Sequence, residues 1–264
     1  MPEGPEVKLF VDKLNSLYKG QKIVDLKVTS GRYIKKPIEN LDLLKNKVVN
    51  SFNCKGKFIW FEFDDVVVFN TLGMTGSWNN KKTDHTRLEI RFENNKFLYF
   101  NDIRNFGTFQ VKSHTELKKK LKTIGPDMFS DPPDEFVPLL RKHNHKNICD
   151  VIMNQKVISG VGNYIKAESL WYSRINPHAL IKDLTDDHLV ILDKAIRFVI
   201  NKSYQEQGAS IQSYYTFEGD SGSAVQGFVV YGKSLDYNGN KVIKEQTLDK
   251  RTTHWVKERQ TRGA

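Results

Sequence analysis

Cysteines are scarce in this sequence, and long hydrophobic runs are absent. Only two cysteines, Cys54 and Cys149, occur in 264 residues, so no disulfide framework is expected and a reducing compartment is predicted. No apolar stretch approaches the roughly 18 residues that a membrane-spanning helix needs, and no charged and then apolar leader opens the chain. These absences predict a soluble intracellular protein.

Negative charge is also in short supply. Lys and Arg number 41 against 31 Asp and Glu, which gives a net charge of +10 at pH 7. The basic residues are spread along the whole chain, so they predict a basic folded surface whose partner is an anionic polymer, nucleic acid before membrane. The alternative is a protein that is merely basic. The length allows one large or two medium domains.

One amphipathic helix and then many short strands are predicted for the first half of the chain. Apolar residues recur with the 3.6-residue period over 5–18, and Gly20 ends this helix. Short runs that alternate apolar and polar residues follow without an intervening helix, which predicts an antiparallel sandwich or barrel-like unit. The expected strands are Lys22–Thr29, Lys47–Phe52, Phe58–Phe63, Val66–Asn70, Leu88–Phe92, Phe97–Phe100 and Thr108–Val111.

The second half is predicted to be mostly helical. Prolines and glycines at 125–133 mark a linker, and 209–227, polar and rich in Gly and Ser, is expected to be a long mobile loop. The expected helices are Glu116–Lys122, Phe136–His143, Ile148–Met153, Gly162–Tyr172 and Thr185–Gln205, the last with Thr185 as its N-cap. The expected strands are Phe228–Tyr231, Val242–Lys244 and Thr253–Val256.

These features predict an α+β protein in four segments. The segments are a β-sandwich domain at 1–118, a linker at 119–134, a helical domain at 135–227 and a terminal segment with strands at 228–264.

The N-terminal residues Met1-Pro2-Glu3-Gly4 carry a possible nucleophile. Pro2 is small enough for Met1 to be trimmed, which would leave a secondary amine with an unperturbed pKa of about 8. Such an amine can attack a carbon at the aldehyde oxidation level and form an iminium, with Glu3 beside it as a proton donor and acceptor. The alternative is an ordinary helix start, where the helix dipole favours acidic residues.

Two internal stretches could bind phosphate. Gly160-Val161-Gly162-Asn163 is a glycine-rich turn running into a helix, where free N–H groups and the Asn163 amide face a ligand. It is no dinucleotide fingerprint, because no strand precedes it and the third glycine is missing. Arg251, among threonines on a predicted hairpin, could clamp a phosphate bidentately. The alternatives are a tight helix–turn–helix without a ligand and a basic terminal tail.

Six motifs, in order along essentially the whole chain, resemble those of the formamidopyrimidine-DNA glycosylase/endonuclease VIII family of base-excision repair enzymes. They are Pro2-Glu3-Gly4-Pro5-Glu6, Gly56-Lys57-Phe58, Leu72-Gly73-Met74-Thr75-Gly76, Asp102-Ile103-Arg104-Asn105-Phe106-Gly107, Gly160-Val161-Gly162-Asn163 and Arg251-Thr252-Thr253. The resemblance implies an N-terminal β-sandwich with a long first helix, then a helix–two-turn–helix domain with a β-hairpin finger. The implied roles are Pro2 as nucleophile, Glu3 as catalytic acid/base, Glu6 as a supporting or lesion-pocket residue, Lys57 as a catalytic residue on a phosphate, Asn163 and Arg251 on further phosphates, and Met74, Arg104 and Phe106 as void-filling side chains.

The finger departs from the bacterial pattern. Where bacterial relatives carry two Cys-x-x-Cys pairs for zinc, this chain has Leu235, Asn238, Val256 and Arg259. His254 alone cannot make a tetrahedral zinc site. The resemblance therefore implies a zincless finger held by packing, as in the Nei-like enzymes of animals and large viruses, with the viral ones closest. The sequence His143-Asn144-His145 is expected to be a polar helix end or loop, not a metal site.

The resemblance implies a bifunctional DNA glycosylase/AP lyase that needs no metal or redox cofactor. The enzyme would flip an oxidised base out of the duplex and fill the gap. The Pro2 amine would attack C1′ and displace the base, Glu3 would protonate the sugar ring oxygen, and β- and δ-elimination would break the strand. The implied partner is damaged double-stranded DNA, with single-stranded DNA left open, bound by a monomer in a nucleus, nucleoid or viral factory.

Two other functions compete with this one. A catalytically silent DNA-binding protein of the same fold would not need Pro2, Glu3 and Lys57 together, and an RNA-binding helix–two-turn–helix protein would leave the N-terminal motif unexplained. Oxidised pyrimidines, formamidopyrimidines and hydantoins are all open as lesions. The sequence at 208–214 looks more like the purine-lesion branch of the family, which conflicts with the zincless finger.

Overall fold

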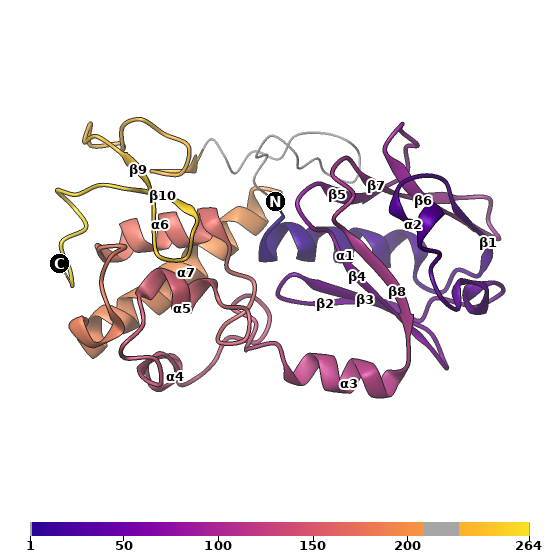
Figure 1. Ribbon diagram of the computed structural model, residues 1–264, viewed down its shortest axis with the longest axis horizontal. Coiled ribbons are helices and arrows are strands. Elements are labelled where there is room, and N and C mark those ends of the chain that lie inside the picture. The colour runs from indigo at the N-terminus through magenta and orange to yellow at the C-terminus, as the bar shows by residue number, and fades with distance from the viewer. Residues whose placement is uncertain (1, 209–226, 264) are drawn as a thin grey trace. The chain divides into compact units, whose positions relative to one another are not determined.

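The computed structural model describes residues 2–208 and 227–263, so all but Gly227 of the predicted loop lies outside the described residues. Two compact units carry them (Figure 1). The first is formed by the described parts of Met1–Lys122 and Glu206–Val225, and the second by Thr123–Gln205 and the described part of Gln226–Ala264. No helix in the described ranges is both long and apolar enough to cross a membrane.

The first unit contains two antiparallel four-stranded sheets, which confirms the predicted sandwich. Their strand orders are β1-β6-β7-β5 and β2-β3-β4-β8. The strands are β1 (Ile23–Val28), β2 (Ser51–Lys55), β3 (Phe58–Glu62), β4 (Val67–Thr71), β5 (Gly76–Asn79), β6 (Thr86–Phe92), β7 (Phe97–Asp102) and β8 (Thr108–Lys112). The helices are α1 (Gly4–Tyr18), α2 (Arg32–Lys35), the short 3-10 helix η1 (Leu41–Leu44) and α3 (His114–Lys122).

Two strand predictions need correction. β5 was not predicted, because Gly, Ser and Asn have low strand propensity and the segment gains its conformation by pairing with β7. The strand expected from Lys47 begins instead at Ser51. The residues before Ser51 pair with another segment: the Ile23 N–H donates to the Lys47 carbonyl, and the Val49 N–H donates to the Gln21 carbonyl.

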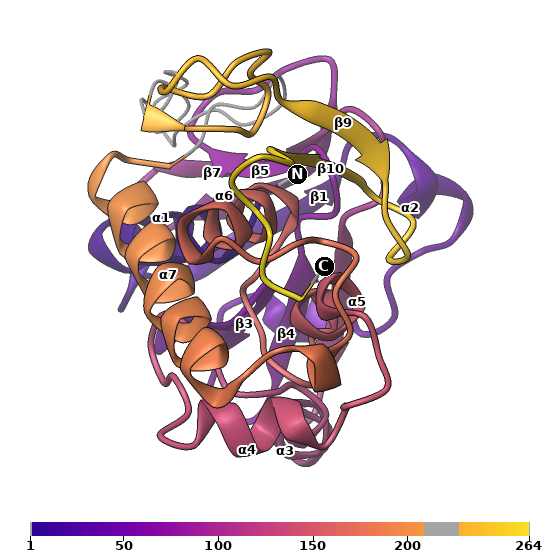
Figure 2. The ribbon, with the colours of Figure 1, turned by 90° about the vertical axis from the view of Figure 1, so that its left-hand side faces the viewer.

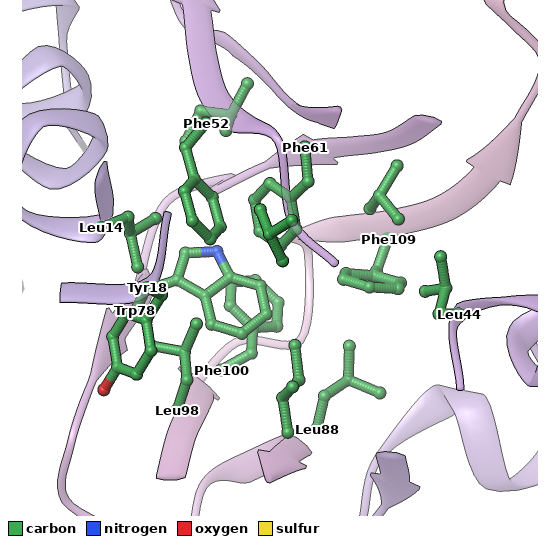
Figure 3. Packing of buried hydrophobic residues seen from close by; sticks show 14 of the residues in the cluster. Leu14, Tyr18, Leu44, Phe52, Phe61, Trp78, Leu88, Leu98, Phe100 and Phe109 are labelled. Carbon is green, nitrogen blue, oxygen red and sulfur yellow. The ribbon is translucent and has the colours of Figure 1, made fainter. Parts of the chain in front are cut away.

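Trp78 of β5 lies at the centre of the sandwich core. Its indole is fully buried, with ring centroids 5.4 Å from Phe61 and 4.9 Å from Phe100 (Figure 3). A buried indole N–H needs an acceptor, and Trp78 Nε1 donates to the Asn70 side chain at 3.0 Å. Leu14 of α1 belongs to the same apolar cluster, so the helix that begins at the N-terminal motif is fixed to the sandwich by its apolar face.

The second unit is helical with one β-hairpin. Its helices are α4 (Phe136–Arg141), α5 (Ile148–Met153), α6 (Asn163–Ser173), the 3-10 helix η2 (Ile181–Asp183) and α7 (Asp186–Gln205), and the hairpin strands are β9 (Ile243–Gln246) and β10 (Thr252–Trp255). Thr185 caps α7 as predicted, since its Oγ1 accepts the His188 N–H at 3.2 Å. The hairpin lies beside α6 (Figure 2), where Val242 and Val256 pack with Trp171 of α6.

Phe228–Tyr231 is not a strand, contrary to its prediction. Its β-branched and aromatic residues suit a strand, but none of the strands that the structure describes pairs with it. The backbone N–H groups of Val229, Val230 and Tyr231 donate instead to the carboxylate of Glu168, at 2.8–2.9 Å. A side chain of α6 thus replaces the neighbouring strand as acceptor.

Candidate active site and nucleic-acid interface

The N-terminal motif forms the start of α1. Glu3 is the N-cap, with an extended backbone at φ −109° and ψ −170°, and a proline occupies the first helical turn, where no N–H is needed. Glu3 and Glu6 form a capping box, in which the Glu3 carboxylate accepts the Glu6 N–H and Glu6 Oε2 accepts the Glu3 N–H at 2.8 Å. Both side chains are buried. A fixed carboxylate therefore adjoins Pro2.

Lys57 lies in the turn between β2 and β3, where Gly56 adopts a left-handed φ of 58°. Asn15 of α1 ties that hairpin to the helix, because its amide donates to the Phe52 carbonyl at 2.7 Å and accepts the Phe52 N–H at 2.9 Å. The helix spans about 17 Å from Asn15 back to the start of α1. The strand spans about the same length from Phe52 to Lys57. The β2–β3 turn and the start of α1 lie at one end of the unit (Figure 1).

The structure brings the three predicted void-filling side chains together. Arg104 Nη1 lies 3.0 Å from the sulfur of Met74, and its guanidinium carbon is 4.9 Å from the centroid of the Phe106 ring. Arg104 is exposed and Phe106 is 52% exposed. An exposed cluster of this kind can insert between bases.

Asp102 fixes both of the loops that carry these side chains, and sequence reasoning gave it no role. Its Oδ1 accepts the Thr75 hydroxyl at 2.5 Å and its Oδ2 accepts the Gly107 N–H at 2.7 Å. Thr75 Oγ1 in turn accepts the Arg104 N–H at 2.9 Å. Asp102 opens the Asp-Ile-Arg-Asn-Phe-Gly motif, and this position was the only signal in the sequence, because its burial is known from the structure alone.

Two of the residues predicted to bind phosphate, Asn163 and Arg251, belong to the second unit. Asn163 is the first residue of α6, after the N-cap Gly162, and Arg251 is an exposed residue just before β10. Asn163 Nδ2 donates to the backbone carbonyl of Thr252 at 2.8 Å. One N–H of that amide is thus used, and the second can serve a ligand. The start of a helix such as α6 is also suited to an anion, because the helix dipole is positive there.

The residues at the zinc-ligand positions of the finger do not fit zinc. Val256 is fully buried in the apolar cluster, and Leu235 is 55% exposed. The Arg259 guanidinium lies 3.7 Å from the centroid of the Trp171 ring. Zinc needs thiolate, imidazole or carboxylate ligands, and none of these residues supplies one. Across residues 2–208 and 227–263, no group of three or more His, Cys, Asp and Glu side chains could hold a metal ion.

Asp236 organises the same region through hydrogen bonds. Its Oδ1 accepts the backbone N–H groups of Asn238 and Asn240, both at 2.9 Å, and its Oδ2 accepts Trp171 Nε1 at 3.3 Å. Burial acts to raise the pKa of Asp236, but hydrogen bonds from Asn240, Trp171 and Asn238 outweigh it and hold the pKa below its usual value.

Glu168 is a further residue that sequence reasoning missed. It is buried on α6 and holds Val229, Val230 and Tyr231 through their backbone N–H groups. Burial raises the pKa of Glu168, while the N–H groups of Tyr231, Val229 and Val230 act in the opposite direction. His143 and His145, by contrast, lie in the turn between α4 and α5, as predicted.

Comparison with known proteins agrees with this architecture. Two family models match, the formamidopyrimidine-DNA glycosylase N-terminal domain over residues 1–109 and the formamidopyrimidine-DNA glycosylase H2TH domain over 124–215. The formamidopyrimidine-DNA glycosylase of Cytobacillus firmus is 31% identical over 244 residues, which are 88% of this chain and 89% of the relative. That of Wolbachia pipientis subsp. Culex pipiens is 33% identical over 242 residues, again 88% and 89%.

Solved structures give the same result. The fold is similar to that of Lactococcus lactis Fpg in a complex with DNA containing an abasic site, with a TM-score of 0.89, 27% identity and coverage of 98% of this chain and 99% of that chain. A complex of a mutant of the same protein with DNA containing Fapy-dG gives a TM-score of 0.87 at 26% identity, covering 98% and 100%. The chain therefore belongs to the formamidopyrimidine-DNA glycosylase/endonuclease VIII family of DNA base-excision repair enzymes.

Proposed function

We propose that this chain is a bifunctional glycosylase/AP lyase that uses the Pro2 amine as its nucleophile. The observation that carries the proposal is the capping box at the start of α1, which fixes the buried Glu3 carboxylate beside Pro2. Pro2, freed of Met1, attacks C1′ of the damaged nucleotide and displaces the base, so that an N–C1′ bond forms as the C1′–base bond breaks. Glu3 then protonates the sugar ring oxygen, the C1′–O4′ bond breaks, and the nitrogen lone pair forms the iminium. The iminium makes the C2′ protons acidic, so successive β- and δ-elimination expel the 3′ and 5′ phosphates.

The remaining site residues bind the DNA around the extruded base. We propose that Lys57, Asn163 and Arg251 hold phosphates by charge-assisted or amide hydrogen bonds. Met74, Arg104 and Phe106 fill the space left in the duplex. Glu6 supports Glu3 through its bond to the Glu3 N–H. The proposed form is a monomer on damaged double-stranded DNA.

We propose that the finger needs no zinc, which would place the chain near the Nei-like branch and its viral members. The support for this is the set of residues at positions 235, 238, 256 and 259. The curated relatives are named for formamidopyrimidine, and one Lactococcus lactis complex holds Fapy-dG DNA. Formamidopyrimidines are therefore the first lesions to assay, before oxidised pyrimidines and hydantoins.

Borohydride trapping on duplex DNA that contains a formamidopyrimidine or an abasic site tests the mechanism. The wild-type protein should become covalently linked to the DNA, because borohydride reduces the iminium. Pro2→Gly, or a form that retains Met1, should bind the same DNA without becoming trapped. Robust strand cleavage by the Met1-retaining form would refute the role of Pro2. Binding without trapping or cleavage by the wild type would favour the catalytically silent DNA-binding protein.

A further inference from the structure

A buried ion pair lies behind the turn that carries Arg251. Lys166 Nζ of α6 is 2.5 Å from Asp249 Oδ2, in the loop between β9 and β10, and the two side chains are 0% and 4% exposed. Burying two charges costs free energy that their attraction offsets only in good geometry, so such a pair is weak support for stability alone. The pair therefore needs another explanation.

Asp249 holds the turn from the inside. Its Oδ1 accepts the Thr247 hydroxyl at 2.5 Å and the backbone N–H of Arg251 at 3.3 Å. The Thr247 N–H donates to the Arg251 carbonyl at 3.1 Å, and Lys250 adopts a left-handed φ of 58°. The backbone groups on both sides of the Arg251 Cα are thus fixed by the loop itself.

Lys166 fixes this loop to the helix that carries the other phosphate-binding side chain. Lys166 and Asn163 are three residues apart on α6, so they lie on one face of the helix. Asn163 donates to the Thr252 carbonyl on one side of Arg251, and Lys166 donates to Asp249 on the other. Two contacts from one helix face therefore hold the loop around Arg251.

We propose that Lys166 and Asp249 are positioning residues that hold the Arg251 guanidinium in register with Asn163, so that both reach the DNA backbone together. The inference rests on the phosphate contacts proposed above. A loop that is already fixed loses less conformational entropy when Arg251 binds a phosphate. The pair also places a positive charge beside the Asp249 carboxylate, which offsets its negative charge near the phosphate that Arg251 is to bind.

Equilibrium binding to a duplex with an uncleavable abasic-site analogue, measured over a series of salt concentrations, tests this role. Lys166→Met and Asp249→Asn should each weaken binding about tenfold and lower the salt slope by up to about one unit, toward the behaviour of Arg251→Ala. In the Arg251→Ala background, Lys166→Met should cause no further loss, because the side chain that it positions is gone. Lys194→Met, on an exposed part of α7, controls for the loss of one positive charge.

Thermal unfolding separates this role from a loss of the fold. If Lys166→Met, which leaves a buried carboxylate unpaired, fails to fold, Lys166→Met/Asp249→Leu takes its place because it buries no charge. Folded variants with the wild-type affinity and salt slope, or losses that add to that of Arg251→Ala, would overturn the proposal. An unchanged slope for Arg251→Ala would instead contradict the phosphate contact itself.

Discussion

The side-chain amide of Asn163 donates a hydrogen bond to the backbone carbonyl of Thr252, at 2.8 Å. The bond joins the first residue of α6 to the strand that directly follows Arg251. The hydrogen bond therefore brings the backbone beside Arg251 to Asn163, although Asn163 and Thr252 are 89 positions apart in the chain. Substitutions of Asn163 or Arg251 should therefore affect the same step, the binding of the DNA backbone.

Lys57→Ala should weaken DNA binding equally for damaged and undamaged sequences. A phosphate contact carries no base information and releases about one counterion, so the salt slope should fall by about one unit. Binding isotherms over a series of salt concentrations measure both quantities. Lys55→Ala is the matched control, since Lys55 ends β2 two residues earlier. A change of slope for Lys55→Ala and none for Lys57→Ala would transfer the contact to Lys55.

Gly73→Ala should slow base excision, whereas Gly20→Ala, with a similar loss of stability, should not. Gly73 has φ +61°, and an added Cβ would lie 2.9 Å from the backbone of Phe106 and Gly107, so the loop carrying Arg104 and Phe106 must move. Gly20→Ala is the control, because Gly20 has φ +78° with nothing within 4 Å of the added Cβ. Each variant should lose about 1–2 kcal/mol of stability from the left-handed backbone. Only Gly73→Ala should slow single-turnover excision, and equal rates in the two variants would contradict the expectation.

Chelators should leave both activity and the melting temperature unchanged. A structural zinc contributes on the order of 10 kcal/mol to folding, so its removal would unfold a metal-dependent finger. Here the hairpin is held by Val242, Val256 and Trp171 in an apolar cluster. Elemental analysis that finds one zinc per chain, or inactivation by a chelator, would rule out the metal-free finger.

Arg251→Ala should reduce DNA affinity while the melting temperature stays at the wild-type value. A lost charge-assisted hydrogen bond costs about 1.5–3 kcal/mol, and the exposed Arg251 side chain has little packing to lose. Affinity for an uncleavable substrate analogue and thermal unfolding measure the two effects. A drop in melting temperature as large as the loss of affinity would show that Arg251 supports the fold instead.

Asp236→Asn should destabilise the second unit at neutral pH and much less in acid. Because the folded-state pKa of Asp236 is lowered, its carboxylate contributes stability above its unfolded pKa of about 3.9, and that contribution is lost as pH falls through the folded pKa. Unfolding measured from pH 3 to pH 7 should show a constant difference between variant and wild type above about pH 5 that shrinks below about pH 4. An equal difference at both ends of the range would exclude Asp236 as the titrating group.

Helices and hairpins were predicted best where local chemistry decides them. α5 was predicted to the residue, and the 3.6-residue period over 5–18 located α1 to within one residue at its N-terminal end. Polar turns located the β3–β4 and β6–β7 hairpins. β5 was missed because only Trp78 among its residues favours a strand, and its pairing partner β7 lies about 20 residues away in the sequence.

The sequence by itself determined the elements, the basic charge and the ordered motifs, because periodicity, turn residues and the Pro2 amine are properties of short stretches. Only the tertiary structure decided which distant groups meet. Asp102 joins the Thr75 and Gly107 loops, Glu168 binds residues 61–63 positions away, and Lys166 pairs with Asp249 across 83 positions. These contacts depend on how the chain packs, since a buried charge needs its partner in space and no local pattern records where that partner is.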